Sequence, residues 1–295
     1  MAEKPTLLST KTAAGADAGQ AGLIAFQGAP GAYSHLACRQ AYPKMTPLPC
    51  TSFEDAFEAV EKGQAALAMI PIENSQAGRV ADIHLLIPHT ELRIVGEHFQ
   101  RVQHCLLGLP GAPLAGIAAA YSHAQALGQC RLYLRHHGIA PRLHHDTADA
   151  ARLIKQLGDP GNAAIASALA AEIHGLDILA RDIEDAQHNT TRFVILAQQA
   201  LASPPADGPV MTSLLFAVRN IPAALYKALG GFATNGVNMT KLESYMTDGG
   251  FVAAEFYAEI DGRPDDPSVK LALEELAFHS KWVKLLGTYR QARPR

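Results

Sequence analysis

From Leu23 to Ala197, short apolar runs alternate with amphipathic stretches, and this alternation constrains the fold more than any other feature of the chain. Short apolar runs bounded by polar residues are typical of buried strands, whereas apolar residues at helical spacing are typical of helices that bury one face. The alternation predicts an α/β fold with a mostly parallel sheet, in which ligands bind at the carboxyl ends of strands. The expected strands are 23–27, 66–72, 117–122, 163–166 and 193–197, and the expected helices are 32–41, 52–61, 123–136, 147–157 and 168–174.

A second pattern follows the segment from Ala202 to Pro209, which has the proline-rich composition of a linker. Its order of strand, helix, strand, strand, helix, strand predicts a ferredoxin-like βαββαβ domain. Pro222 is expected in the first turn of its first helix, and Gly230 with Gly231 is expected to interrupt that helix. The expected strands are 213–219, 237–245, 251–260 and 283–289, the helices are 220–229 and 267–278, and residues 247–250 form a hairpin turn. We therefore expect a disordered tail over 1–21, a first domain over 22–198, a linker over 199–209 and a second domain over 210–292.

Composition and charge argue against several classes of protein. The chain has 25 Lys and Arg against 28 Asp and Glu, a net charge of −3, which argues against a nucleic-acid binder. The longest stretch without charged residues, from Val102 to Cys130, is interrupted by proline and glycine and is no membrane span. The four cysteines are far apart, which argues against a zinc site or redox motif, and the N-terminus lacks a signal-peptide pattern. We therefore expect a cytoplasmic protein.

Polar side chains cluster at the ends of several expected strands. Glu73, Asn74 and Ser75 follow one strand directly, Ser122 ends another with Gln129 shortly after it, and residues 189–192 precede a third. Serine at a strand end is also a good helix N-cap, and this reading applies to Ser122 as well as to Ser167. Because strand ends in α/β sheets converge on one crevice, these three clusters and Ser167, which follows the expected strand 163–166, nevertheless predict a ligand site.

Other motifs carry less information. Gly28 to Gly31 could cradle an anion at a helix N-terminus or form an ordinary tight turn, and it lacks the dinucleotide and P-loop signatures. The pairs His136-His137 and His144-His145 are expected to be solvated or capping residues, because adjacent side chains point apart. Ser52 with Asp55, and Thr147, are expected to cap the helices that they begin. No serine nucleophile elbow occurs, and we expect no metal and no cofactor.

Four motifs together resemble those of the prephenate dehydratase family. They are Gly28-Ala-Pro-Gly-Ala-Tyr-Ser34, Pro71-Ile-Glu-Asn-Ser75 with Gly78 and Val80, Ser122-His123 with Gln129-Cys130, and Asn189-Thr-Thr-Arg-Phe193. Residues 213–260 resemble that family's C-terminal ACT regulatory domain. The resemblance implies a two-lobed catalytic domain like a periplasmic binding protein, with prephenate in the cleft. One departure is Ala124, where the family often has proline.

The resemblance implies decarboxylative dehydration of prephenate to phenylpyruvate in phenylalanine biosynthesis, a hydro-lyase reaction. It also implies that activity depends on Thr191, and it matches Glu73, Asn74, Ser122 and Gln129 to cleft positions. Departure of the ring hydroxyl needs a proton donor, and Thr191 is favoured by the match whereas Glu73 would be the better acid if it were buried. Ser75 and Thr190 are further candidate substrate ligands. Arg192 suits a carboxylate by charge, but strand alternation would turn it away from Thr191.

The resemblance also implies regulation by phenylalanine, bound between paired ACT domains of a homodimer or tetramer. The implied site contains Asn220, Ala223, Leu225, Leu242, Glu243 and Ser244. Two departures affect it, since Ala223 stands where glycine is usual and Tyr245-Met246 where Arg-Pro is usual. A module that serves dimerisation alone is the alternative.

Two other functions stay open. Arogenate dehydratase would use a substrate with an amine in place of the keto group, and no residue decides between the two substrates. A non-catalytic protein that binds a small molecule would also have a cleft and a sensing module, although it would not need the Thr191-Arg-Phe element.

Overall fold

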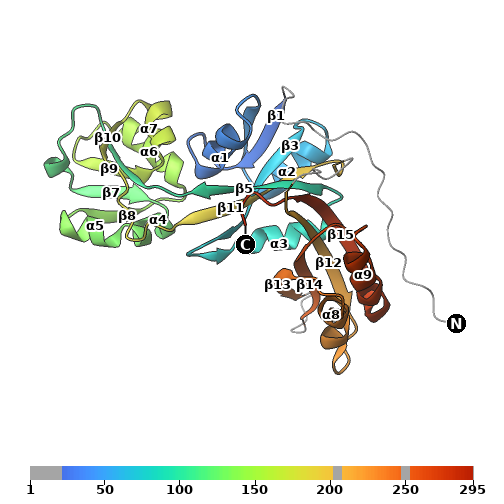
Figure 1. Cartoon of the computed structure of the whole chain (residues 1–295). Helices are drawn as coiled ribbons and strands as arrows, with labels where there is room; N and C mark the ends of the chain where they lie inside the picture. Colours follow the sequence, from blue (N-terminus) through green and yellow to red (C-terminus); the bar gives the residue numbers. More distant parts are fainter. Residues whose placement is uncertain (1–21, 202–207, 247–252, 295) are drawn as a thin grey trace. The chain divides into compact units, whose positions relative to one another are not determined.

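The computed structural model describes residues 22–201, 208–246 and 253–294. The predicted tail, most of the predicted linker and the predicted hairpin turn at 247–250 lie outside these residues. Within them, no helix is long and apolar enough to cross a membrane. The described residues form a mixed α/β fold with three sheets (Figure 1).

The first sheet has the strand order β2-β1-β3-β11-β5, with β4 paired to β3. Strand β1 pairs in parallel with β2 and β3, and helices α1 and α2 pack on these strands. The strands are β1 Leu23–Gln27, β2 Thr46–Cys50, β3 Leu67–Asn74, β4 Gly78–Arg79, β5 Arg93–Arg101 and β11 Thr190–Ala197, and the helices in this part of the chain are α1 Tyr33–Ala41, α2 Phe53–Glu61, α3 Ala81–Leu86 and the 3-10 turn η1 Ile87–His89.

The second sheet has the strand order β10-β6-β9-β7-β8. Strand β7 pairs in parallel with β8 and β9, whereas β6 pairs antiparallel with β9 and β10. The elements are β6 Cys105–Gly108, η2 Leu114–Gly116, β7 Ala119–Ser122, α4 Ala124–Gln129, α5 Arg131–His136, β8 Ala140–Leu143, α6 Thr147–Leu157, β9 Asn162–Ala166, α7 Ala168–His174 and β10 Asp177–Ala180. The five strands expected in this region all form, but they are divided between two sheets with additional strands, among them the buried β6 and the mostly exposed β8.

Helix caps explain where several helices begin, and they correct three expectations. Ser52 and Asp55 form the predicted capping box of α2, and Ser167 caps α7. The cap of α6 is Asp146, not Thr147, because the Asp146 carboxylate accepts the N–H of Asp149. His123, not Ser122, caps the next helix, and the helix expected over 123–136 breaks at Cys130 into α4 and α5.

The turn after β1 lies directly against the start of α7. Ser167 Oγ donates to the Gly31 carbonyl at 2.5 Å, and a Cβ atom on Gly31 would lie 2.8 Å from the Cα of Ala170. Gly31 also has a φ of +99°, which side-chain-bearing residues rarely adopt. Glycine at this position therefore allows a backbone-to-backbone contact between elements of the first and second sheets.

The described residues divide into two compact units. One contains residues 22–83 and 98–193, and we call it the cleft unit. The other, the C-terminal unit, contains 84–97 together with the described residues from 194 onward. Residues 84–97 and 194–197, which fall within the range expected for the first domain, thus pack with the C-terminal elements.

The C-terminal unit contains an antiparallel sheet of order β13-β14-β12-β15. Its elements are β12 Val210–Val218, α8 Ala224–Thr234, β13 Met239–Met246, β14 Ala253–Asp261, α9 Pro267–His279 and β15 Ser280–Arg290. Helices α8 and α9 bury apolar residues against one sheet face, and residues 84–97 contact the sheet through Arg93 and Lys284. This enclosure explains why β12 is buried along its whole length.

The first helix of this unit differs from expectation at both ends. Helix α8 begins at Ala224, so Pro222 precedes it, and the helix continues through Gly230 and Gly231. A Cβ atom on Gly231 would lie 2.7 Å from the Cβ of Glu275 on α9. Gly231 therefore allows α8 to pack closely against α9, and it does not interrupt the helix.

We predict that Ala223→Gly stabilises the protein. Ala223 has a φ of +61°, and this left-handed conformation costs a residue with a side chain about 1 kcal/mol more than glycine. Urea unfolding should show a higher midpoint at an unchanged slope. Ala233→Gly is the matched control, because the same change inside the exposed face of α8 should cost about 1 kcal/mol. A lower midpoint for Ala223→Gly would contradict the prediction.

Candidate active site

A cleft of about 530 Å³ lies within the cleft unit, and residues from both of its sheets line it. Asn74 is the last residue of β3, Gln129 ends the helix that follows β7, and Thr191 is the second residue of β11, so strand ends meet at this cleft as predicted. Among the predicted site residues, Asn74, Gln129 and Thr191 line this cleft.

Asn74 is held in one orientation by the turn that follows β3. Its Oδ1 accepts the backbone N–H groups of Gln76 at 3.0 Å and Ala77 at 2.9 Å. The amide nitrogen must therefore point the other way, where it donates to Asn189 Oδ1 at 2.7 Å and to Thr191 Oγ1 at 3.0 Å.

This orientation determines what Thr191 can do. Since its oxygen accepts an N–H from Asn74, its own hydroxyl proton is available to an acceptor in the cleft. A hydroxyl whose oxygen accepts one hydrogen bond is polarised into a better donor. Thr191 is thus arranged as a hydrogen-bond donor toward a ligand.

Glu73 and Arg192 bind each other. Arg192 Nη1 lies 3.0 Å from Glu73 Oε1, the arginine is buried, and its guanidinium lies 6.0 Å from the centre of the Phe99 ring. Thr191 and Phe193 line the cleft and Arg192 does not, so strand alternation outweighs charge at this position. An arginine partner favours the ionised form of a carboxylate, which disfavours Glu73 as a proton donor.

Three other predicted ligands lie outside the cleft lining. Ser122 is fully buried, and its Oγ donates to the Ile165 carbonyl at 2.7 Å. Ser75 Oγ donates to the His188 carbonyl and accepts the N–H of Thr190, so both residues hold the two strand ends together. Their hydrogen bonds support the walls of the cleft, and of the predicted site residues only Asn74, Gln129 and Thr191 line it.

Several residues that line the cleft were missed by the sequence analysis. They are Tyr33, Arg79, His104, His123 and His145, among others. Tyr33 lies in the glycine-turn motif, which carries part of the family resemblance but predicts no ligand contact for the tyrosine. His104 lies inside the charge-free stretch that had been considered only as a possible membrane span.

One histidine pair forms a polar cluster beside the cleft. His144 Nε2 and His145 Nε2 lie 2.8 and 3.4 Å from Asp149 Oδ2, and these three side chains could approach a metal ion. Arg152, however, grips the same carboxylate with two N–H groups at 2.6 and 3.0 Å. Because Arg152 binds both carboxylate oxygens of Asp149, the cluster is better explained as a structural ion pair than as a metal site.

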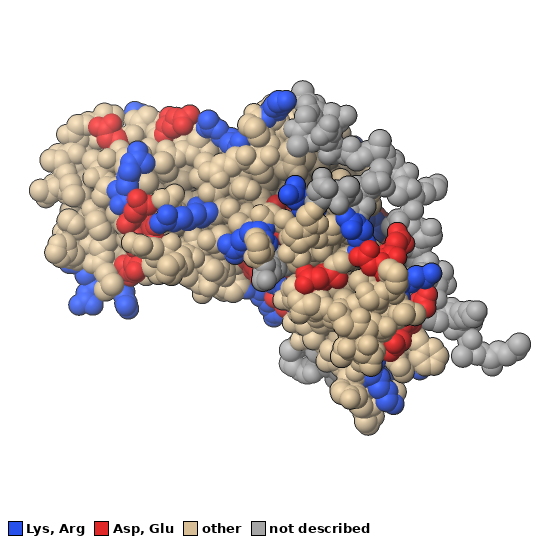
Figure 2. Space-filling model, in the orientation of Figure 1, with Lys and Arg blue, Asp and Glu red and all other residues tan. Residues whose placement is uncertain are grey.

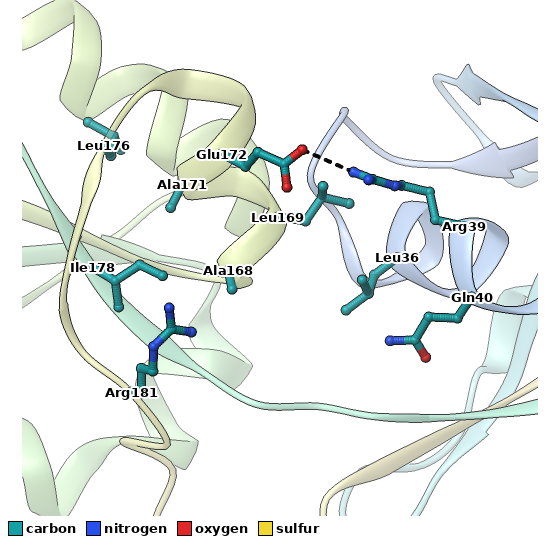
Figure 3. Close-up of a pocket in the computed structure, with 10 residues that line it drawn as sticks. All are labelled: Leu36, Arg39, Gln40, Ala168, Leu169, Ala171, Glu172, Leu176, Ile178 and Arg181. Carbon is teal, nitrogen blue, oxygen red and sulfur yellow. Dashed lines mark hydrogen bonds and ion pairs between the residues drawn. The ribbon is translucent and has the colours of Figure 1, made fainter. Parts of the chain in front are cut away.

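A second pocket, of about 630 Å³, lies between α1 and α7 (Figure 3). Arg39 and Glu172 reach toward each other across it at 3.4 Å, and both side chains are exposed. Exposed ion pairs contribute little free energy, and none of the predicted site residues lines this pocket. The strand-end cleft is therefore the better candidate site.

The distribution of surface charge does not indicate a nucleic-acid site. On the face drawn in Figure 2, basic and acidic side chains of the described residues are interspersed, and no continuous basic stripe crosses it. A nucleic-acid site would need such a stripe.

The residues predicted to bind phenylalanine are divided between sheet faces. Glu243 pairs across β14 with Tyr257 and Ser244 with Phe256, so their side chains lie on opposite faces. Glu243 Oε1 lies 3.0 Å from Lys241 Nζ, whereas Leu242 and Ser244 are exposed. Asn220 and Ala223 are exposed before α8, and Leu225 is partly buried in it. Glu243 and Ser244 therefore cannot both direct their side chains into one pocket of a single unit.

Comparison with known proteins identifies close relatives. A family model described as prephenate dehydratase matches residues 24–201. The chain is 53% identical over 267 residues to a bifunctional N-acyl-homoserine lactone acylase/prephenate dehydratase of Komagataeibacter europaeus, covering 90% of this chain and 95% of the relative. It is 39% identical over 280 residues to arogenate dehydratase/prephenate dehydratase 1 of Arabidopsis thaliana, covering 90% of this chain and 71% of the relative.

Two solved structures are similar over nearly the whole chain. A protein named GqqA, described as a novel type of quorum quenching acylase, has a TM-score of 0.86 and 52% identity, and covers 92% of this chain and 98% of its own. Prephenate dehydratase from Arthrobacter aurescens, in complex with L-Phe, has a TM-score of 0.84 and 32% identity, and covers 92% of each chain.

We predict that Asp149→Asn removes part of the acid sensitivity of the fold. Hydrogen bonds from Arg152 and His144 lower the pKa of Asp149 from 3.8 to about 2, against the opposing effect of burial. The ionised form therefore stabilises the fold above pH 4, by about 2 kcal/mol, and this contribution disappears as the pH falls from 4 to 2. Urea unfolding at several pH values should show Asp149→Asn less stable at pH 6 and equal to wild type near pH 2. A pH-independent difference would contradict the prediction.

Proposed function

The chain belongs to the prephenate dehydratase family, and from that premise we propose that it converts prephenate to phenylpyruvate. The observation that carries the proposal is the hydrogen bond from Asn74 to Thr191, which directs a hydroxyl donor into the cleft. We propose residues 22–198 as the catalytic region and 210–292 as an ACT-type regulatory region. Thr191 is the proposed catalytic residue.

The reaction needs little chemical assistance beyond a donor. The carbon–carbon bond to the ring carboxylate breaks and releases carbon dioxide, its electron pair enters the ring, and the ring carbon–oxygen bond breaks. The ring becomes aromatic, which drives the reaction, and the departing hydroxide takes one proton to form water. A positioned donor at the leaving oxygen therefore lowers the main barrier.

The residues of the cleft divide this work between them. Thr191 donates to the departing hydroxyl, while Asn74 holds and polarises it. Gln129 and Arg79, which both line the cleft, supply N–H groups suited to the substrate's carboxylates. Glu73 binds Arg192 and helps to fix the strand that carries Thr191.

Arogenate is the alternative substrate, and the named activities of the plant relatives support it. It differs from prephenate only where an amine replaces the keto group, so the leaving-group chemistry at Thr191 is the same. Comparison of kcat/KM for both substrates decides between them.

A second candidate activity is hydrolysis of N-acyl-homoserine lactones. It is supported by the relative at 53% identity that is named bifunctional and by the similar acylase structure. The direct test is incubation with N-acyl-homoserine lactones of several chain lengths, followed by chromatography for free homoserine lactone and fatty acid. Release that stops in Thr191→Val would assign both reactions to one cleft, and absence of release at high enzyme concentration would exclude the second activity.

Regulation by phenylalanine is the third part of the proposal. The similar Arthrobacter structure contains L-Phe, and exposed apolar side chains such as Ile221 and Tyr226 surround the start of α8. Strand β13 lies at the edge of its sheet, and an exposed edge favours pairing with a second copy. Pairing would let Glu243 of one copy and Ser244 of the other approach one ligand.

We predict that Thr191→Val lowers kcat by about 100-fold or more, because it removes the hydroxyl that binds the leaving oxygen and keeps the side-chain shape. Thr191→Ser is the control and should retain most of kcat. Glu73→Gln should lose stability more than kcat, since it removes a charged partner of the buried Arg192. Phenylpyruvate absorbance at alkaline pH and thermal melts measure both effects. A larger loss of kcat in Glu73→Gln than in Thr191→Val would exchange the two roles.

We predict that phenylalanine binds to a dimer or tetramer and inhibits the enzyme, with a coupling of about 1–3 kcal/mol between the two sites. Light scattering should give at least twice 31.4 kDa, and calorimetry should detect phenylalanine. Ser244→Ala should weaken binding without changing kcat in the absence of phenylalanine. If calorimetry detects no heat of binding at millimolar phenylalanine and the enzyme keeps full activity, dimerisation alone is the role of the C-terminal unit.

A further inference from the structure

The hydrogen bonds at Asn74 continue into a chain that reaches His104 and Tyr33. Asn189 Nδ2 donates to Gln129 Oε1 at 3.0 Å, His104 Nε2 lies 2.8 Å from the same oxygen, and the Tyr33 hydroxyl lies 2.8 Å from His104 Nδ1. These side chains come from the start of α1, the residue before β6, the end of α4 and the residue before β11. All of them lie in the cleft unit.

The direction of each bond follows from Asn74. Its amide nitrogen donates to Asn189 Oδ1, so the amide nitrogen of Asn189 must face Gln129 and donate to its Oε1. That oxygen is an acceptor, and an unprotonated ring nitrogen of His104 could not bind to it. Nε2 of His104 must therefore carry a proton.

The other ring nitrogen is fixed by burial. His104 is 2% exposed, and desolvation is the main effect that lowers its pKa, so the neutral ring is favoured. A neutral ring protonated at Nε2 has an unprotonated Nδ1, which accepts from Tyr33. The Tyr33 hydroxyl has one proton and lies 2.8 Å from two acceptors, the Gln103 carbonyl and His104 Nδ1, which share that proton.

We propose that His104 is a positioning residue that, together with Asn189, holds the carbonyl oxygen of Gln129 away from the cleft and so turns its NH2 group toward the substrate. Gln129 lines the cleft and can turn either end of its amide toward a ligand unless its partners prevent it. With its oxygen engaged by two N–H groups, it offers only donors. The group that it binds is therefore an acceptor, the class to which the carboxylates and keto oxygen of the proposed substrate belong.

Only the kinetic tests of this proposal rest on the proposed dehydratase activity. Ring ¹⁵N chemical shifts of labelled wild-type protein, assigned by the signals lost in His104→Gln, report the tautomer without any substrate. We expect Nε2 protonated and Nδ1 unprotonated. A ring protonated at Nδ1 alone would overturn the proposal even in an active enzyme, and the expected tautomer in a protein without dehydratase activity would refute only the proposed function.

A double-mutant cycle tests the coupling to Gln129. His104→Leu and Gln129→Leu should each lower kcat/KM by about 10- to 100-fold, because a substrate donor is misplaced or removed. The double variant should be no worse than Gln129→Leu alone, whereas multiplicative losses would overturn the proposal.

Matched variants separate positioning from packing. Cys105 is buried next to His104 in the sequence but is not part of the hydrogen-bond chain. Cys105→Ala therefore loses packing alone and should keep kcat/KM near wild type. His104→Gln keeps an N–H donor near Gln129 and should recover part of the activity lost in His104→Leu. Equal losses in His104→Gln and His104→Leu would overturn the proposal. Tyr33→Phe removes the hydroxyl at the far end of the hydrogen-bond chain. It replaces His104→Leu as the test if that variant fails to fold.

Discussion

Two backbone N–H groups, those of Gln76 and Ala77, hold the carbonyl oxygen of Asn74, and the polar order of the cleft depends on them. Because a side-chain amide has one donor end and one acceptor end, fixing one end fixes the other. Asn74 consequently donates in two directions, toward Thr191 and toward Asn189. The tight turn after β3 thus sets the direction of hydrogen bonds to residues that are distant in sequence, and it does so through backbone N–H groups.

The sequence predicted most of the regular elements, and the predicted residues Asn74, Gln129 and Thr191 line the cleft, whereas the failures have physical causes. Strands with a clear apolar pattern, such as β1 and β9, form as expected. Strand β8 was missed because three of its four residues are exposed, so it has no apolar pattern to detect. The division into two sheets was not expected from local pattern, since pairing between strands depends on contacts distant in the sequence.

The site shows the same difference between local and long-range information. Charge favoured Arg192 as a substrate ligand and alternation along β11 opposed it; Arg192 does not line the cleft, so the rule that involves only neighbours in sequence was the better guide. The buried position of Ser122 was not evident, since its acceptor, the Ile165 carbonyl, is 43 residues away. His104 was missed for a similar reason, as its partners belong to elements that only the fold brings together.

The close approach of Gly31 to Ala170 has a consequence for how this cleft can be altered. Main chain meets main chain there, so the spacing between the turn after β1 and α7 is set by glycine geometry and by the Ser167 hydrogen bond. The side chains that line the cleft do not determine this spacing. Ligand preference can therefore be redesigned, or can drift during evolution, by exchanging lining residues while the gap at this junction keeps its width.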